Sequence, residues 1–266
     1  MVSFPPCKIN LGLNILRKRS DGYHDIETCF YPVPFTDILE VIPSSEFSFT
    51  LSGNAVPGNV EDNLCVKAYR LMQAVYSLPP AKIHLHKIIP TGAGLGGGSS
   101  DAAWTLRLLN DVFDLKLSKE TLKEYASRLG SDCAFFIDDG PMMGTGRGEI
   151  LTPVKIDLKG KYLALVKPEV HVSTAQAYEG VRPAEPKNRI ANILTKQVAE
   201  WRGLLENDFE RTVGEKLPVI RSIKEKLYEA GAEYASMTGS GSAVYGIFSK
   251  KPQFEIGGRV QTVVML

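Results

Sequence analysis

Pro90-Thr-Gly-Ala-Gly-Leu-Gly-Gly-Gly-Ser-Ser-Asp-Ala-Ala103 forms a glycine-rich loop that leads directly into a run of good helix formers, Ala102 to Leu109. Five glycines within residues 92–98 give the backbone conformations that other residues avoid, and they leave no side chains between its N–H groups and a ligand. The helix that follows directs unpaired N–H groups and the positive end of its dipole at the loop. The segment therefore predicts an anion site, and phosphate in particular.

Two other phosphate-binding loops fit this segment less well. Gly92-Ala-Gly-Leu-Gly-Gly97 matches the dinucleotide pattern G-x-G-x-x-G, with Asp111 or Asp114 as a loose ribose contact, but a lone match is weak evidence. The preceding strand, Lys82 to Ile88, alternates like an antiparallel strand with one wet face, whereas a dinucleotide fold places a continuous apolar strand there. A P-loop would end in lysine and Ser or Thr, and this loop has no lysine. A glycine-rich turn that only caps a helix is the structural alternative.

Length and composition are those of a globular protein. The 266 residues are 44% hydrophobic and 23% charged, which suits two modest domains or one large one. A net charge of +1, no run as long as a membrane span and no secretory signal predict a cytoplasmic protein without a nucleic-acid or membrane partner. Four scattered cysteines without a C-x-x-C pair predict free, packed thiols.

Hydrophobic periodicity predicts a mixed α+β fold. Strands are expected at 7–16, 25–42, 47–52, 82–88, 161–167, 242–248 and near 259–265. Helices are expected at 62–76, 99–112, 118–129 with Ser118 as N-cap, around 173–180, 189–199, 203–213 and 218–230. Residues 140–148 read as a second glycine-rich turn. The pattern restarts near Thr152-Pro153, so we place the domain boundary there, giving domains 1–153 and 154–266.

A few polar groups could carry chemistry. Lys8 and Asn10 fall on one face of a strand, where such a pair is more often solvent-facing than functional. Asp132 stands at the entrance of an apolar element, as a helix cap or as a functional acid. Tyr23-His24 follows the turn Asp21-Gly22 and offers a stacking surface beside a ring that hydrogen-bonds. A third glycine element, Ser236 to Ser242, suits close backbone approach to a ligand or to the first loop.

The order of these elements resembles the three motifs of the GHMP small-molecule kinases, which include galactose, homoserine, mevalonate and phosphomevalonate kinases. The motifs here are Lys8-Ile-Asn-Leu, Pro90 to Ala103, and Met237-Thr-Gly-Ser-Gly-Ser. The segment Lys8–Thr28, with Asp-Gly-Tyr-His, is similar to the branch that acts on a cytidine diphosphate-linked methylerythritol. Further similar segments are Glu61–Leu64, Gly130–Phe136, Gly146–Leu151 and Asn207–Glu210.

The resemblance implies a two-domain GHMP kinase fold, with an N-terminal domain like ribosomal protein S5 domain 2 and a ferredoxin-like C-terminal domain. The implied reaction transfers a phosphoryl group from ATP to the 2-hydroxyl of the substrate, in the non-mevalonate route to isoprenoids. By position, Asp132 would be the catalytic base and Lys8 its partner, which keeps the aspartate ionised and neutralises charge on the moving phosphoryl group. Asn10 would orient the acceptor.

The resemblance also implies the remaining contacts. ATP would be held by Asn63 on the adenine side and by Pro90, Gly92, Gly94, Leu95, Gly96, Gly97, Gly98, Ser99 and Ser100. Mg²⁺ is expected, with Ser100 as its contact. Asn10, Tyr23, His24, Asp132, Tyr178, Thr238 and Gly239 would contact the substrate, with His24 on the cytosine edge and Tyr23 and Tyr178 flanking the ring. Asp101 receives no role, and we expect a monomer or weak homodimer.

Three other functions stay open at this point. A dinucleotide-dependent oxidoreductase leaves Lys8, Asn10 and the loop at 237–242 unexplained. A non-catalytic relative would be expected to lack the base or the lysine, and both Asp132 and Lys8 are present. A mevalonate-type kinase is the nearest competitor, and only the Tyr23-His24 region speaks against it.

Overall fold

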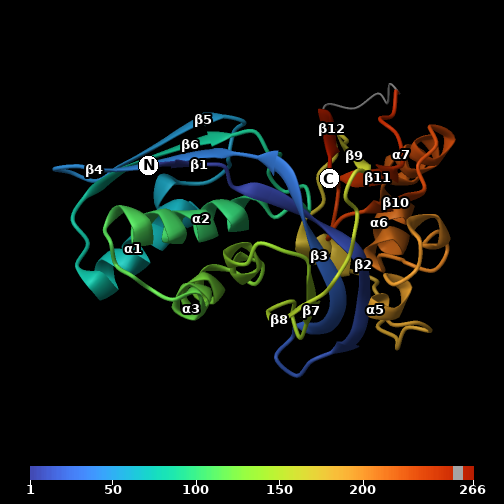
Figure 1. Cartoon of the computed structure of the whole chain (residues 1–266). Coiled ribbons are helices and arrows are strands. Elements are labelled where there is room, and N and C mark those ends of the chain that lie inside the picture. Colours follow the sequence, from blue (N-terminus) through green and yellow to red (C-terminus); the bar gives the residue numbers. More distant parts are fainter. Residues whose placement is uncertain (254–259) are drawn as a thin grey trace. The chain divides into compact units, whose positions relative to one another are not determined.

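The computed structural model describes residues 1–253 and 260–266, which divide into two compact units (Figure 1). Unit 1 consists of Met1–Cys7, Phe35–Thr91 and Gly96–Asp139, and unit 2 of Lys8–Pro34, Gly92–Leu95 and Gly140–Leu266. The chain therefore passes between the units several times. The boundary predicted at 153 stays a prediction.

Unit 1 is built on a four-stranded sheet with the strand order β1-β4-β6-β5. Its strands are β1 (Val2–Ser3), β4 (Ile38–Pro43), β5 (Ser48–Gly53) and β6 (Ala81–Lys87). Along β6, Ile83, Leu85 and Lys87 are buried while the residues between them are exposed or half-buried, which confirms the alternation seen in the sequence. β6 pairs antiparallel with β4 but parallel with β5.

Three helices complete unit 1. α3 (Lys119–Leu129) begins after Ser118, the predicted N-cap, whereas α1 (Leu64–Tyr76) begins two residues later than predicted. α1 starts after Asn63, whose side chain accepts a hydrogen bond from the Cys65 N–H. α2 (Gly97–Val112) packs against α1 and β4 and begins two residues earlier than predicted. The short 3₁₀ helices η1 (Val60–Asp62) and η2 (Cys133–Ile137) precede α1 and follow α3.

The prediction of one strand over 25–42 is wrong, because the chain forms β3 (His24–Thr36) and β4 with a break at Asp37. Asp37 is fully buried, and its Oδ1 accepts hydrogen bonds from the N–H groups of Ile88, at 2.5 Å, and Ile89, at 2.8 Å. A buried carboxylate needs such donors. The break therefore places Asp37 against the end of β6.

Among the described residues of unit 2 there are two four-stranded sheets. The first has the order β2-β3-β7-β8, with β2 (Pro6–Lys18), β7 (Met142–Thr145) and β8 (Ile150–Pro153). The expected glycine-rich turn at 140–148 is wrong in part, because Met142–Thr145 pair with β8. Only the tip is a turn, where Gly146 and Gly148 have φ of +67° and +108°.

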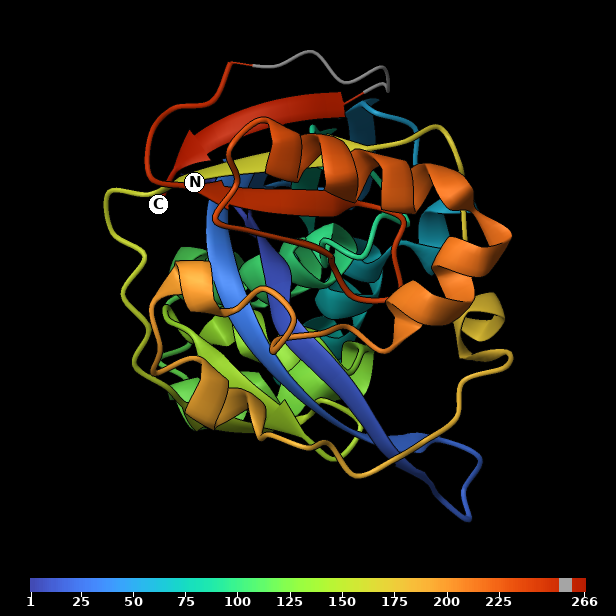
Figure 2. The ribbon, with the colours of Figure 1, turned by 90° about the vertical axis from the view of Figure 1, so that its right-hand side faces the viewer.

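The second sheet of unit 2 is antiparallel throughout and has the order β10-β11-β9-β12. Its strands are β9 (Tyr162–Lys167), β10 (Tyr234–Met237), β11 (Val244–Phe248) and β12 (Val260–Met265). Helix α7 (Pro218–Glu229) crosses its face with α6 (Phe209–Lys216) beside it (Figure 2). This strand order is that of a ferredoxin-like fold, as expected. Residue 259, the first of the predicted last strand, lies outside the described residues.

The segment between β9 and α7 is less helical than predicted. α4 (Thr174–Tyr178) forms behind a Ser173 capping box, but the helix expected at 189–199 is only α5 (Ile190–Ile193) and the 3₁₀ helix η3 (Val198–Glu200). The helix expected at 203–213 begins instead at Phe209. Its first residues are drawn into extended contact with β2, where the Leu13 N–H donates to the Glu206 carbonyl and the Asp208 N–H to the Leu13 carbonyl, each at 2.8 Å.

A hydrophobic cluster within unit 2 joins β2 to the second sheet and its helices. Leu13 and Ile15 of β2 pack with residues of β9, β10, β11, α6 and α7, including Val166, Phe209 and Leu227. Burial of such side chains contributes roughly 1.5–3 kcal/mol each. Within residues 1–253 and 260–266, no helix combines the length and the apolar character needed to cross a membrane.

Candidate functional site

Lys8 and Asn10 share one face of β2, as predicted, but the expectation that this face is solvent-facing is wrong. Lys8 is 3% exposed and Asn10 is 2% exposed. Lys8 Nζ donates to Asn10 Oδ1 at 2.6 Å and to the Gly94 carbonyl at 3.0 Å, and it lies 5.3 Å from the centroid of the Phe30 ring. Buried polar groups of this kind need partners, and segments far apart in the sequence supply them.

Thr238 joins the third glycine element to the same cluster. Its hydroxyl accepts from the Asn10 N–H at 3.0 Å and lies 3.2 Å from both Asn10 Oδ1 and the Gly94 carbonyl. A hydroxyl has one proton, so it donates to one of these two oxygens at a time. Residues 8, 10, 94 and 238 therefore meet in unit 2. The third glycine element thus approaches the first loop, as the sequence suggested, and Gly239 follows Thr238 directly.

The first half of the glycine-rich loop, Gly92–Leu95, is fixed by backbone contacts within unit 2. The Lys8 N–H donates to the Leu95 carbonyl at 2.9 Å, and the Ala243 N–H donates to the Ala93 carbonyl at 3.1 Å. Gly94 has a φ of +77°, and a Cβ there would lie 2.1 Å from the Thr238 carbonyl oxygen. Glycine is therefore required at 94 both by conformation and by close approach.

The second half of the loop, Gly96–Ser100, belongs to unit 1 and starts α2. Gly96 has a φ of +69°, and the Ser100 N–H closes the first turn on the Gly96 carbonyl. The first N–H groups of this sixteen-residue helix are therefore those of Gly97, Gly98 and Ser99, which is the arrangement that an anion site at a helix start requires. Pro90 immediately precedes the loop.

Ser100 is the residue to which the resemblance assigns Mg²⁺. It is fully buried, and its Oγ has no hydrogen-bond partner among the residues that the structure describes. In the same residues, no group of three or more His, Cys, Asp or Glu side chains could hold a metal ion. Mg²⁺ bound with a nucleotide takes one or two protein ligands beside phosphate and water oxygens, so a lone hydroxyl at 100 fits that ion.

Unit 1 has a cavity of about 280 Å³ next to the start of α2. Asn63, Thr91 and Gly98 line it together with apolar side chains of β5, including Phe49 and Leu51. Asn63, assigned by resemblance to the adenine side, therefore shares a cavity with a glycine of the loop. A volume of this size and mixed apolar and polar walls suit a small planar ring system.

The same cavity is lined by two charged residues, Lys87 and Asp101, and the sequence analysis assigned Asp101 no role. Lys87 Nζ lies 2.7 Å from Asp101 Oδ2 and also pairs with Asp37. Burial raises the pKa of Asp101 to about 7, although the Lys87 ammonium opposes this. Burial lowers the pKa of Lys87, but the two carboxylates outweigh it and the net shift is upward.

Asp132 belongs to unit 1 and is the residue immediately before η2. It is half-buried, and its side chain does not cap the 3₁₀ helix that it precedes. The capping role considered in the sequence analysis is therefore wrong. Cys133 and Phe135, which follow, are buried, so the carboxylate sits at the margin of an apolar cluster.

The two aromatic positions assigned to cytosine have different surroundings in unit 2. The rings of His24 and Tyr178 are stacked, with centroids 4.7 Å apart and planes 16° apart, and Phe209 meets Tyr178 edge-on. Tyr23 is 55% exposed, and the Arg147 guanidinium lies 4.9 Å from its ring centroid. Burial, together with the charge of Lys18, lowers the pKa of His24, which keeps the imidazole neutral at pH 7.

The sequence analysis missed several residues that hold the cluster of Lys8, Asn10, Gly94 and Thr238 in place. Thr28 Oγ1 accepts from Asn10 Nδ2 at 2.9 Å, and the Tyr245 hydroxyl donates to the Asn10 carbonyl at 2.8 Å. Asn207 Nδ2 donates to the carbonyls of Met237 and Gly239 on either side of Thr238. Thr28 and Asn207 lie in segments already noted as similar to the family, but spacing alone did not indicate their partners.

A second cavity, of about 890 Å³, lies in unit 2 between the 181–188 segment, α6 and α7. Charged side chains of both signs line it, among them Arg182, Arg221 and Glu225. None of the residues assigned to the site from the sequence lines this cavity.

Comparison with known proteins shows the family of the chain. Residues 63–140 match the family model for the GHMP kinase N-terminal domain, and residues 190–263 match the model for the GHMP kinase C-terminal domain. A 4-diphosphocytidyl-2-C-methyl-D-erythritol kinase of Cytophaga hutchinsonii is 52% identical over 95% of this chain and 94% of its own length. The kinase of the same name from Bacteroides fragilis is 51% identical over 94% of this chain and 92% of its own.

Solved structures lead to the same fold. A crystal structure of 4-(cytidine 5'-diphospho)-2C-methyl-D-erythritol kinase superposes with a TM-score of 0.79 at 31% identity, over 93% of this chain and 90% of that one. Mevalonate kinase of Methanococcus jannaschii superposes with a TM-score of 0.70 over 93% of this chain and 90% of its own at 15% identity, which shows the fold alone. These matches exclude the alternative that the chain is a dinucleotide-dependent oxidoreductase. The chain belongs to the GHMP kinase family of small-molecule kinases, within the group of 4-diphosphocytidyl-2-C-methyl-D-erythritol kinases.

Proposed function

We propose that the chain transfers the γ-phosphoryl group of ATP to the 2-hydroxyl of 4-diphosphocytidyl-2-C-methyl-D-erythritol, a step of the non-mevalonate route to isoprenoid precursors. The main structural support is the buried cluster of Lys8, Asn10, Gly94 and Thr238, to which each of the three GHMP kinase motifs contributes at least one residue. Relatives of about 50% identity that carry this substrate in their names support the choice of acceptor.

Each residue receives a role that its chemistry allows. Asp132 takes the proton from the 2-hydroxyl as that oxygen attacks phosphorus, and ADP leaves. Lys8 neutralises charge on the transferred group, and Asn10 orients the acceptor oxygen. Direct transfer of this kind depends on positioning and charge, so no covalent intermediate on the protein is required.

The nucleotide is assigned to unit 1 and the loop. Asn63 borders the adenine, and the main-chain N–H groups from Gly92 to Ser100 hold the phosphates. Mg²⁺, with Ser100 as its protein contact, would neutralise phosphate charge. His24 binds the cytosine edge, with Tyr23 and Tyr178 on the ring faces, and Gly239 lies beside the acceptor. A cytoplasmic monomer or weak homodimer stays a prediction.

The test is ADP release with the cytidylated methylerythritol, with mevalonate and homoserine as competing acceptors. We expect turnover with the cytidylated substrate alone. Asp132→Asn should lower kcat by roughly 10³-fold while nucleotide binding is retained, because the amide cannot accept the proton. Asp111→Asn, at an exposed position of α2, is the matched control. Equal turnover of mevalonate would refute the substrate, and near-normal turnover of Asp132→Asn would refute the base.

A further inference from the structure

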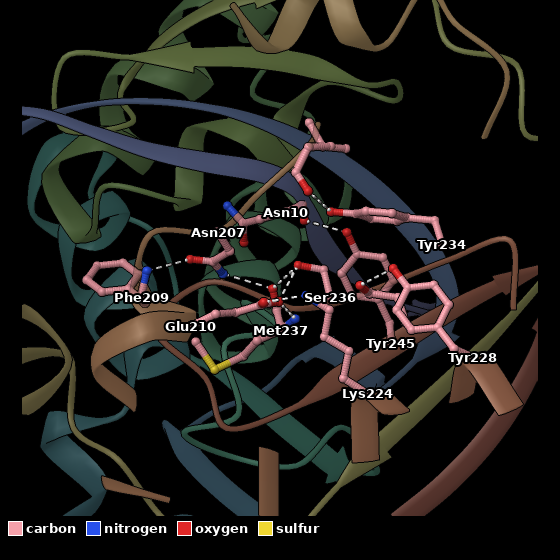
Figure 3. A network of polar contacts seen from close by, with 12 residues as sticks. Asn10, Asn207, Phe209, Glu210, Lys224, Tyr228, Tyr234, Ser236, Met237 and Tyr245 are labelled. Carbon is pink, nitrogen blue, oxygen red and sulfur yellow. Dashed lines mark hydrogen bonds and ion pairs between the residues drawn. The ribbon is translucent and has the colours of Figure 1, made fainter. Parts of the chain in front are cut away.

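The side-chain amide of Asn207 donates both of its protons to the third motif, and its oxygen accepts from the start of α6. Its Nδ2 donates to the Met237 carbonyl at 2.8 Å, and its Oδ1 accepts from the Phe209 N–H at 3.1 Å (Figure 3). Nδ2 also donates to the Gly239 carbonyl at 2.9 Å. Asn207 is 2% exposed. Both N–H groups of the amide therefore donate to the two carbonyls that flank Thr238. Only a side chain with two donors at this position can bond both carbonyls.

Glu210, one turn further on, holds the strand that leads into the same residue. Its Oε1 accepts from the Met237 N–H and the Ser236 hydroxyl, each at 2.7 Å, and its Oε2 accepts from Lys224 Nζ at 2.5 Å (Figure 3). Hydrogen bonds to an ionised acceptor are about twice as strong as neutral ones. Glu210 therefore fixes the two residues before Thr238, and Lys224 fixes Glu210.

The segment 206–210, which contains Asn207 and Glu210, also forms hydrogen bonds with β2, the strand that carries Lys8 and Asn10. The Asp208 N–H donates to the Leu13 carbonyl at 2.8 Å, and the Ile15 N–H donates to Asp208 Oδ2 at 2.6 Å. Leu13 is only three residues beyond Asn10. Residues 206–210 thus form hydrogen bonds with β2, which carries Asn10, and with the third motif, which carries Thr238. These are the two segments that meet where Asn10 contacts Thr238.

We propose that Asn207 and Glu210 are positioning residues for phosphoryl transfer, which hold Thr238 against Asn10 and so fix the amide that orients the acceptor. The proposal rests on the proposed function, since it assigns that amide to the acceptor. Neither residue contacts substrate in this scheme. Their effect passes through the Thr238 hydroxyl, whose bonds to Asn10 and Gly94 need the loop in one place.

Isosteric substitutions test the idea without changing side-chain volume. Asn207→Asp places a carboxylate oxygen against two carbonyl oxygens, and Glu210→Gln removes the ion pair with Lys224. We expect kcat to fall by up to about 10²-fold, as small displacements of reacting groups do, while the KM for ATP changes little. Asn192→Asp and Glu215→Gln, both at exposed positions, are the matched controls. Equal losses in variants and controls, or a change confined to the KM for ATP, would overturn the proposal.

A double-mutant cycle separates positioning from general stability. If Asn207 acts through Thr238, the pair Asn207→Ala and Thr238→Val should lose little more kcat than the worse single variant. Additive losses would show that Asn207 acts elsewhere. Should Asn207→Asp fail to fold by circular dichroism, this cycle with the milder alanine variant carries the test.

Amide hydrogen exchange supplies a readout that does not depend on the substrate. The peptide spanning residues 234–243 should exchange faster in Asn207→Ala and Glu210→Gln than in the wild type, and unchanged exchange in both would contradict the proposal. If the wild-type protein fails to turn over the cytidylated substrate, the proposed function fails. The exchange result then still decides whether these residues hold the loop.

Discussion

Lys8 donates a 2.6 Å hydrogen bond to the side-chain oxygen of Asn10, two residues along the same strand. Its second acceptor, the Gly94 carbonyl at 3.0 Å, comes from the glycine-rich loop. These two hydrogen bonds fix the position of the ammonium. In the proposed function an anionic group arrives beside it, and a donor fixed in advance stabilises negative charge that develops during the reaction.

Lys8→Met should therefore lower kcat much more than it lowers stability. Methionine fills nearly the same volume but provides no charge and no donor, and loss of one preorganised donor to a developing negative charge typically costs about 10²–10³-fold. Steady-state ADP release, with the melting temperature measured in parallel, checks this. Lys82→Met, at an exposed position of β6, is the control. An unchanged kcat in Lys8→Met would remove the lysine from the reaction.

His24→Ala should weaken binding of the cytidylated substrate and leave kcat nearly unchanged. The neutral imidazole is stacked on Tyr178, and its loss leaves a polar edge of the base unpaired, which costs roughly 1–3 kcal/mol. That cost corresponds to about a 5- to 150-fold rise in KM. His84→Ala in β6, where His84 bonds only side chains of β5 among the contacts described, is the comparison. A rise in the KM for ATP instead would move His24 out of the cytosine site.

The features predictable from the sequence are those set by local spacing. Alternation indicated that Lys8 and Asn10 share a face, and Ser118 marked the start of α3. Burial of the pair was not predictable by spacing, because Gly94 and Thr238 supply its partners from more than 80 residues away. The motif order indicated that these segments meet only through the resemblance to a known family.

Errors in the predicted elements have the same physical origin. The strand break at Asp37 and the late start of α6 both occur where a segment bonds to a distant strand, and local propensity yields to those tertiary bonds. Asn207 and Glu210 could be noted as similar to the family, but their partners Met237 and Gly239 lie about 30 residues on. Such contacts appear only in three dimensions.

Asp101→Asn should flatten part of the pH dependence of stability. Because burial raises the pKa of Asp101 to about 7, the folded protein retains a proton between about pH 4 and pH 7 that the unfolded chain has lost. The free energy of unfolding contributed by this group therefore falls as pH rises through that range, by at most about 1.4 kcal/mol per pH unit. Denaturant titrations of wild type and variant from pH 4 to pH 8 measure the difference. If the unfolding free energies of wild type and Asp101→Asn change with pH in parallel, the pKa of the Asp101 carboxyl lies outside this range. Asp111→Asn serves as the control.

Glycine is required at position 94 by its positive φ and by its close approach to Thr238. Comparing Gly94→Ala with Gly160→Ala separates these two requirements. Gly94 has a φ of +77° and Gly160 a φ of +81°, so both alanines pay a similar conformational cost of about 1–2 kcal/mol. A Cβ at 160 meets nothing within 4 Å, whereas one at 94 lies 2.1 Å from the Thr238 carbonyl oxygen. Because that atom belongs to the backbone, it cannot rotate away. We expect Gly94→Ala to lose roughly 1–3 kcal/mol more than Gly160→Ala in free energy of unfolding.

The same pair of variants also reports on the cluster. Displacement of Thr238 by the added methyl group would lengthen its contacts with Asn10, so kcat should fall in Gly94→Ala and not in Gly160→Ala. Urea unfolding and ADP release on both proteins give the two readouts. If the two variants lose equal stability and equal activity, then conformation alone demands glycine at 94, and the close approach to Thr238 has no part in holding the third motif against the loop.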